Sequence, residues 1–268
     1  MAATTIAPIA LLKLPAWGDG VTSFQPLANR LWETFARAPA SSMDSVITWL
    51  QGQPIRHCNV GQFQCYELQH ELSQYVAPNS TEIFIDGRTL LEYQVLQQPG
   101  WPSIHTIADG TFQAFCEILK CFHDALGFSE SRFRTQAAYT QRDRTGACTA
   151  YPGPEAIYPQ LGRIYAHWKQ HIYTAPGFAA VVAMTALLNV HPFNDGNGRV
   201  ARLLFHWTIN EGRDSPLYLP IHELSALSQY GYLIRLRQAT YHLNWHPLFS
   251  YLLMCSERLF VGDGSHDL

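Results

Sequence analysis

The sequence predicts a mainly α-helical protein with one β-hairpin. Apolar residues recur at helical spacing along most of the chain, one long apolar run covers Gly177–Val190, and one segment before it alternates as strands do. Hydrophobic residues make up 47% of the 268 residues and charged residues 15%. That charged share is low against about 25% in a typical soluble protein, which favours a compact chain with a large core.

The first half of the chain predicts several separate helices. Residues 62–76 place apolar side chains on one helical face, and Pro78 ends that segment. Residues 110–126 do the same, and Gly127 follows as a helix cap. Shorter helical patterns complete this half. They cover 25–37, 42–51 and 89–96.

The second half starts with the hairpin. Residues 133–140 and 147–151 read as its strands, and Asp143–Gly146 reads as the turn between them. Pro152, Pro154 and Pro159 are then expected to interrupt the chain, so that the next helix begins near residue 160. Helices are expected over 160–172, 177–190, 197–210, 225–243 and 247–260.

Charge, cysteine spacing and hydropathy narrow the function classes. The net charge of −3 indicates no attraction to nucleic acid or to an anionic membrane. The run at 177–190 is too short to span a bilayer and suits a buried helix. The six cysteines match no zinc spacing and read as reduced thiols. We therefore expect a cytoplasmic protein with no membrane or nucleic-acid partner, although export as an effector and self-association stay open.

One loop, at His191–Arg202, concentrates the residues that phosphate-ester chemistry needs. Gly196, Asn197 and Gly198 open a helix directly after a turn, where backbone N–H groups and the helix dipole favour an anion. Arg199 and Arg202 lie three residues apart on one face of that helix, and guanidinium groups match phosphate oxygens.

The remaining residues of this loop complete a reaction site. Asp195 is suited to hold Mg²⁺ beside the phosphates, and His191 is suited to accept a proton from an attacking hydroxyl. Phe193 is expected to point inward and anchor the loop to the core. Taken singly, each of these residues has an ordinary structural interpretation as a cap, a turn or a solvated helix face. Their combination in one loop favours phosphate-ester chemistry.

This loop resembles the signature of the Fic (filamentation induced by cAMP) family, His-x-Phe-x-Asp/Glu-Gly-Asn-Gly-Arg-x-x-Arg. The chain matches it without departure at His191, Phe193, Asp195, Gly196, Asn197, Gly198, Arg199 and Arg202. Weaker likenesses surround it, so that the resemblance covers residues 86–260. It implies a Fic-type helical bundle with a hairpin flap, preceded by a mostly helical extension at 1–85 and followed by a tail at 261–268.

The resemblance implies transfer of AMP from ATP to a Tyr, Thr or Ser hydroxyl of a target protein, with release of pyrophosphate. His191 would be the general base, Asp195 would hold Mg²⁺, Gly196–Gly198 would cradle the phosphates, and Arg199 and Arg202 would neutralise them. The target segment would pair with the hairpin near Arg134–Tyr151. Alternatives stay open: removal of AMP, transfer of another phosphate-containing group, or a catalytically silent nucleotide-binding module.

A brake on this activity is also suggested by the resemblance. Ile85-Asp86-Gly87-Arg88 is similar to an inhibitory segment of the family, in which a glutamate pairs with the second signature arginine. Asp86 would take the place of that glutamate opposite Arg202. Aspartate is one methylene shorter, and Asp86-Gly87 also reads as a simple turn.

Overall fold

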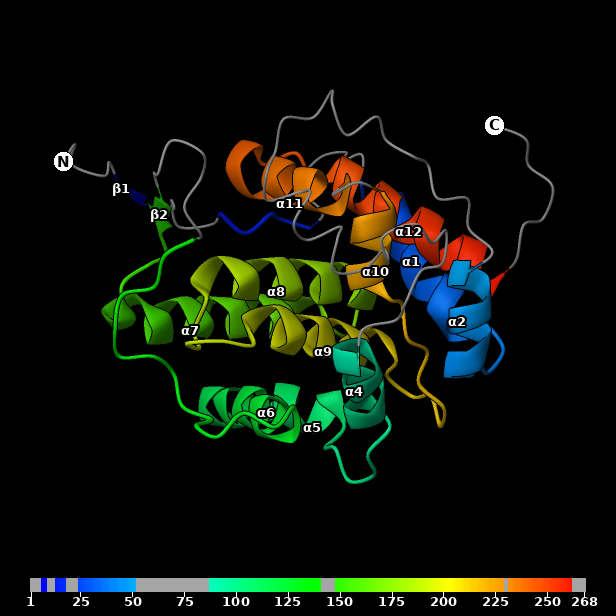
Figure 1. Ribbon diagram of the computed structural model, residues 1–268, viewed down its shortest axis with the longest axis horizontal. Helices are drawn as coiled ribbons and strands as arrows, with labels where there is room; N and C mark the ends of the chain where they lie inside the picture. Colours follow the sequence, from blue (N-terminus) through cyan, green and yellow to red (C-terminus); the bar gives the residue numbers. More distant parts are fainter. Residues whose placement is uncertain are drawn as a thin grey trace, which may run out of the picture.

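The computed structural model describes residues 6–8, 13–17, 24–51, 87–140, 148–228 and 231–261. Two antiparallel neighbours, α8 (Pro176–Val190) and α9 (Asn197–Ile209), run through its centre (Figure 1). Almost every residue of α8 is buried, which confirms the expected buried helix. Because the signature loop joins these two helices, the most tightly packed part of the molecule holds it in place.

The other helices surround this central pair (Figure 1). On one side lie α7 (Pro154–His171), α6 (Phe112–Ala125), α5 (Ile104–Asp109) and α4 (Gly87–Leu96). On the other side lie α1 (Gln25–Arg37), α2 (Met43–Gln51), α10 (Ile221–Leu227), α11 (Gly231–His242) and α12 (His246–Phe260). The fold is therefore mainly helical, as the sequence predicts.

Two of the expected helix bounds were wrong. The prolines after the hairpin do not delay α7: Pro154 starts it at a position where no N–H partner is needed, and Pro159 costs it one backbone bond in the second turn. The helix expected over 225–243 is two helices, since α10 ends at Leu227 and α11 begins at Gly231. Helix α5, capped by the Ser103 hydroxyl, was not expected. The helix expected over 62–76 lies outside the described residues.

The hairpin is confirmed at its base. Tyr139 and Ala150 form an antiparallel bridge, and the Thr140 amide donates to the Thr149 carbonyl at 2.9 Å. The expected turn at 143–146 lies outside the described residues. Strand β2 (Cys148–Ala150) also has a second partner that the sequence did not predict: β1 (Ile6–Pro8) pairs with it in parallel (Figure 1).

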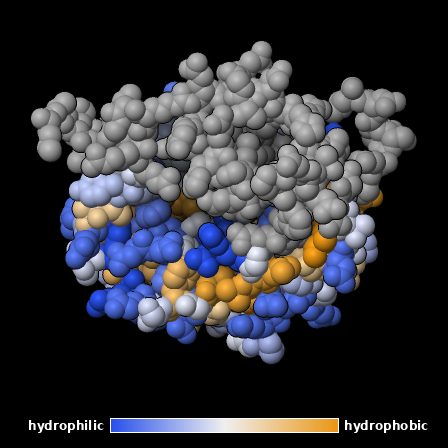
Figure 2. Space-filling model, viewed as in Figure 1, coloured by the Kyte–Doolittle hydropathy of each residue, from blue (hydrophilic) through white to orange (hydrophobic). Residues whose placement is uncertain are grey.

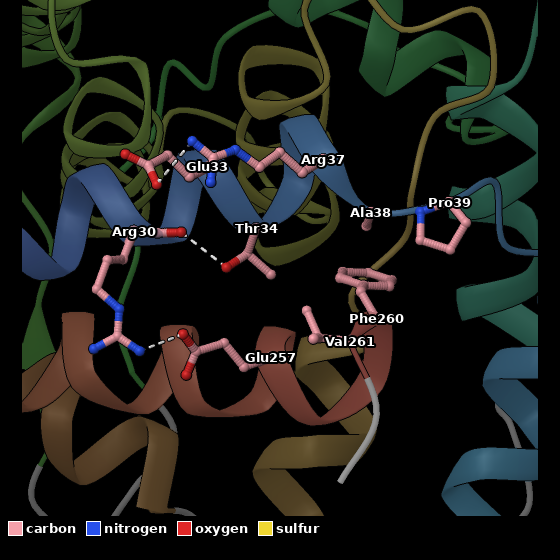
Figure 3. A pocket seen from close by; sticks show the side chains of 9 residues that line it. All are labelled: Arg30, Glu33, Thr34, Arg37, Ala38, Pro39, Glu257, Phe260 and Val261. Atoms are coloured by element: carbon pink, nitrogen blue, oxygen red, sulfur yellow. Dashed lines mark hydrogen bonds and ion pairs between the residues drawn. The ribbon is translucent and has the colours of Figure 1, made fainter. Parts of the chain in front are cut away.

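The surface gives few further hints of function. No helix in the described part of the chain is long and apolar enough to cross a membrane. The face in Figure 2 carries an apolar band flanked by hydrophilic residues. A hollow of about 450 Å³ lies between α1 and α12 (Figure 3), and ion pairs of Arg30 with Glu257 and of Arg37 with Glu33 line it. None of its lining residues belongs to the signature loop.

Candidate active site

The signature loop begins with His191 in a left-handed conformation. His191 has φ 52°, and its amide donates to the Leu187 carbonyl at 3.0 Å, which ends α8. Burial, followed by the nearby Arg134 charge, lowers the pKa of His191 to about 4, while a hydrogen bond to the Leu188 carbonyl acts in the opposite direction. The imidazole is therefore neutral at pH 7, with one ring nitrogen occupied and the other able to accept a proton.

Two side chains fix the path of the loop. Phe193 is fully buried, as expected, and its backbone is bracketed by Asn197, which accepts from the Phe193 amide at 2.8 Å and donates to the Phe193 carbonyl at 2.9 Å. The buried Asn197 side chain is thus committed to holding the loop. The His123 ring lies between Phe128 and Phe193, with both centroids 4.2 Å away, and its Nε2 is 3.2 Å from the Asp195 carbonyl.

The turn before α9 is shaped for an anion. Gly196 has φ +77°, and a Cβ there would collide with the Phe128 ring. The Asp195 carboxylate accepts from the Gly196 amide at 2.6 Å and is otherwise exposed, with its second oxygen 4.0 Å from the Arg199 guanidinium. Arg199 lies over the Phe128 ring at 4.2 Å. The start of α9, where Gly196 and Asn197 are buried and Gly198 is half-buried, is therefore flanked by one exposed carboxylate and one cation.

A buried arginine ties the hairpin to His191. Arg134 donates from Nε to the His191 carbonyl at 2.7 Å, from Nη1 to the Gln136 carbonyl at 2.8 Å, and from Nη2 to the Pro152 carbonyl. Its own amide donates to the Pro192 carbonyl at 2.8 Å. Tyr151, which follows β2 directly, stacks on the His191 ring with centroids 3.9 Å apart. The end of β2 and His191 are therefore held together by direct contacts.

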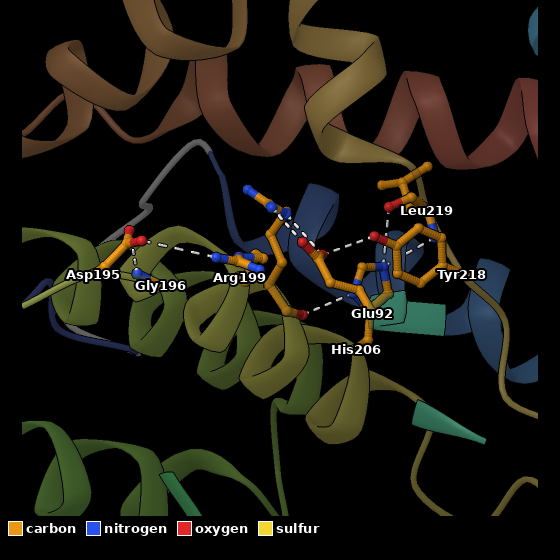
Figure 4. A network of polar contacts seen from close by, with 8 residues as sticks. Glu92, Asp195, Gly196, Arg199, His206, Tyr218 and Leu219 are labelled. Atoms are coloured by element: carbon orange, nitrogen blue, oxygen red, sulfur yellow. Dashed lines mark hydrogen bonds and ion pairs between the residues drawn. The ribbon is translucent and has the colours of Figure 1, made fainter. Parts of the chain in front are cut away.

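The second signature arginine lies in different surroundings. Arg202 donates from Nε and Nη2 to the two carboxylate oxygens of Glu92, at 2.9 and 2.5 Å (Figure 4). Glu92 is fully buried and also accepts from the Tyr218 hydroxyl at 2.8 Å. Burial alone would lower the pKa of Arg202, but the Glu92 charge more than offsets this and raises it. Arg202 is therefore held as a cation that faces Glu92.

Buried titratable groups surround this ion pair. His206 binds the Arg202 carbonyl through Nδ1 at 2.7 Å and accepts from the Leu219 amide through Nε2 at 2.9 Å (Figure 4). Burial lowers the pKa of His206 to about 3 and raises the pKa of the nearby Glu223 to about 7. The carboxylate that contacts the Arg202 guanidinium directly is that of Glu92.

The structure brings together His191, Phe193, Asp195, Gly196, Asn197, Gly198 and Arg199, and turns Arg202 toward Glu92. Sequence reasoning missed Glu92, Tyr151 and His123 because each reaches the loop from a distant segment. Asp86, the residue proposed as the brake, lies outside the described residues. The sequence held one signal for Glu92: it is the single carboxylate of α4 and follows two leucines.

The signature sequence and helical fold have clear counterparts among known proteins. The sequence model of the Fic/DOC family matches residues 115–209. A Fic family protein from Desulfovibrio desulfuricans G20 superposes with a TM-score of 0.58 at 14% identity, over 95% of this chain and 79% of that one. Fic-1 (aa134–508) from C. elegans gives a TM-score of 0.50 at 19% identity, over 89% and 70% of the two chains.

A sequence search of curated proteins gave no match. The solved structures establish the shared fold, and the family match covers α8, the signature loop and α9, which carry the candidate site. These findings support a Fic-type enzyme. Residues 115–209 therefore match the Fic/DOC family with a complete signature, and the chain shares the fold of these solved structures.

Proposed function

We propose that the protein transfers AMP from ATP to a hydroxyl side chain of a target protein and releases pyrophosphate. The observation that carries this proposal is the pairing, within one loop, of a neutral imidazole at the end of α8 with an anion-binding turn at the start of α9. A base and a phosphate site held this close are the two parts that alcohol attack on a phosphoanhydride requires.

His191 would act as the general base. Its left-handed backbone is fixed by Arg134, and its ring plane is fixed by Tyr151. The target hydroxyl gives its proton to the free ring nitrogen while its oxygen bonds to the α-phosphorus. The bond between the α-phosphorus and the bridging oxygen breaks, and pyrophosphate leaves with that electron pair. The imidazolium then returns its proton to solvent.

The start of α9 would hold the phosphates. The first N–H groups of α9 have no carbonyl partner within the helix, and the helix dipole adds partial positive charge there. Arg199 is 19% exposed and its carboxylate neighbour is 4.0 Å away, so it is available to a phosphate oxygen. Stacking on Phe128 limits its rotamers before the nucleotide arrives.

A magnesium ion fits the donor set at this turn. The Asp195 carboxylate is 82% exposed and keeps one oxygen without a close partner. No group of three or more His, Cys, Asp or Glu side chains in the described ranges could form a dedicated cage. One carboxylate beside a phosphate site is the usual environment for Mg²⁺, which when bound neutralises phosphate charge.

Arg202 would reach a phosphate only after leaving Glu92. Its two donors are committed to that carboxylate, which Tyr218 holds from the other side. We therefore propose that Glu92 restrains the activity in this conformation, a role that the sequence suggested for Asp86. The family resemblance supplies the idea of a restraint, and the contact with Arg202 favours Glu92 as its residue.

Labelled nucleotides test the proposed reaction. The purified chain is incubated with Mg²⁺ and with ATP labelled at the α- or the γ-phosphate, and its own labelling and that of added proteins are measured. We expect label from α-labelled ATP alone and an intact-mass gain of one AMP. Label from γ-labelled ATP would instead indicate phosphoryl transfer, and the absence of both in the parent chain and in Glu92→Gln would contradict the proposal.

A further inference from the structure

The edge of the flap strand is occupied by the start of the chain. Strand β1 pairs with β2 in parallel, in the register Ile6–Cys148, Ala7–Thr149 and Pro8–Ala150. On its other side β2 is bonded to residues 138–140 of the hairpin. Both backbone edges of β2 are therefore in use, one by the hairpin and one by β1.

This occupied edge leads to the histidine. Tyr151 directly follows the last residue of β2, and its ring stacks on the His191 ring at 3.9 Å. Because the pairing is parallel, Pro8 lies beside Ala150, at the end of β2 nearest to that stack. A peptide that added itself to β2 along this edge would be guided toward His191, and β1 takes its place.

The N-terminal segment is also anchored just beyond β1. The Pro15 carbonyl lies 2.8 Å from Nε2 of His167 on α7, and the Trp17 ring packs on Phe178 of α8 with centroids 4.8 Å apart. Only a short stretch of chain separates these anchors from Pro8. A tether this short gives the strand a high effective concentration at the edge, even though a pairing of three residues is weak by itself.

The strand is suited to be displaced. Pro8 has no N–H, so one of the three residues donates nothing to the ladder. Main-chain pairing also recognises extended segments of many sequences, which makes the strand and an incoming peptide equivalent competitors. To bind at this edge, a target segment must therefore pair with β2 more strongly than the weakly paired β1 does.

We propose that Ile6–Pro8 is an intramolecular ligand of the flap, which occupies the edge where an extended target segment docks and must be displaced before the target binds. The proposal rests on the proposed function in one respect, namely that targets dock at this edge. Its strand exchange does not depend on AMP transfer and is measured without nucleotide.

The register provides a first test. Neighbouring strands lie about 4.8 Å apart, which is within disulfide range for cysteines at register partners, and Cys148 is a free thiol. We expect mild oxidation of the full-length Ile6→Cys variant to form an intramolecular disulfide with Cys148, seen by peptide mass mapping. Ala7→Cys is the matched control, because its register partner is Thr149. Equal cross-linking in both variants, or none in either, would overturn the pairing.

The second test measures displacement with a labelled synthetic peptide of residues 1–10, without nucleotide. In the full-length Ile6→Pro/Ala7→Pro variant, β1 keeps no backbone donor, so we expect the peptide to bind at least about tenfold more tightly than to the parent chain. Oxidised Ile6→Cys should not bind it until a reductant is added. Equal binding by all of these proteins, or binding by none, would overturn the proposal, whereas peptide exchange without AMP transfer would contradict only the proposed function.

Discussion

The two signature arginines lie one turn apart on α9, and their neighbours put them to opposite uses. Arg199 stacks on Phe128 and faces an exposed aspartate at 4.0 Å. Arg202 makes two short bonds to the fully buried Glu92. Figure 4 shows Arg199 near Asp195 at one end of the network and Glu92 with Tyr218 at the other. The difference teaches that a signature residue becomes available to a ligand only when no other helix supplies it with a carboxylate.

The largest expected effect concerns the proposed general base, which precedes the start of α9 near Arg199. His191→Ala should lower AMP transfer by roughly 10² to 10⁴-fold, because a general base contributes that much. Binding of ATP should change little, since the anion turn is intact. Initial rates with α-labelled ATP and calorimetric binding measure the two quantities. His105→Ala is the matched control, because that histidine is exposed and outside the site; an equal loss of rate there would contradict the assignment.

The next effect concerns the ion pair between Arg202 and Glu92. Glu92→Ala should lower the free energy of unfolding by about 3–5 kcal/mol, because it leaves a largely buried guanidinium without its partner. Urea unfolding at pH 7 measures this change. The double variant Glu92→Ala/Arg202→Ala should recover part of the loss, whereas simple addition of the two single effects would show that the pair is not coupled.

Activity measurements on two variants separate the two candidates for the brake. Glu92→Gln should raise self-labelling by roughly tenfold, a typical size for a coupling between two sites, because it removes the charge that holds Arg202. Asp86→Gly should leave the rate unchanged if Glu92 is the restraint. A rise in Asp86→Gly alone would assign the restraint to Asp86, as first suggested by the sequence.

A smaller effect compares two glycines of nearly equal conformation. Gly196 and Gly212 have φ +77° and +78°, but only at Gly196 would a Cβ meet another residue, Phe128. Both alanine variants should lose about 1–2 kcal/mol of stability from the left-handed backbone. Gly196→Ala should lose a further 1–3 kcal/mol, roughly, from overpacking. Thermal unfolding measures both, and equal losses would show that Phe128 moves aside freely.

The last effect, small per pH unit and per histidine, is a dependence of stability on pH. Burial lowers the pKa of His191 to about 4 and of His206 to about 3, so the folded state binds fewer protons than the unfolded chain in mild acid. Stability present above about pH 6.5 should therefore fall as the pH is lowered toward 4, by at most about 1.4 kcal/mol per pH unit for each histidine. Urea midpoints at pH 7.5, 6 and 5 measure it; a constant midpoint would contradict the buried, neutral state.

Local patterns made much of the fold predictable. The apolar run at 177–190 could only be a buried helix, and Gly196 with Asn197 marked the start of α9. Proline misled the prediction, because its effect depends on how many turns of helix precede it. Pro159 lies in the second turn of α7, where one lost bond is tolerated. Strand β1 could not be predicted, since a three-residue strand has no periodicity of its own.

The sequence alone determined the helical class, the buried pair of helices and the loop between them, because these depend on spacing within one segment. It also determined which side chains of that loop can handle a proton and a phosphate. Only the tertiary structure decided which of them are free: Glu92 reaches Arg202, Arg134 reaches His191, and Ile6–Pro8 reaches the flap, each across a long separation in sequence. Such contacts depend on how the helices pack. No local sequence pattern encodes which distant carboxylate, guanidinium or strand will contact a given residue of the site.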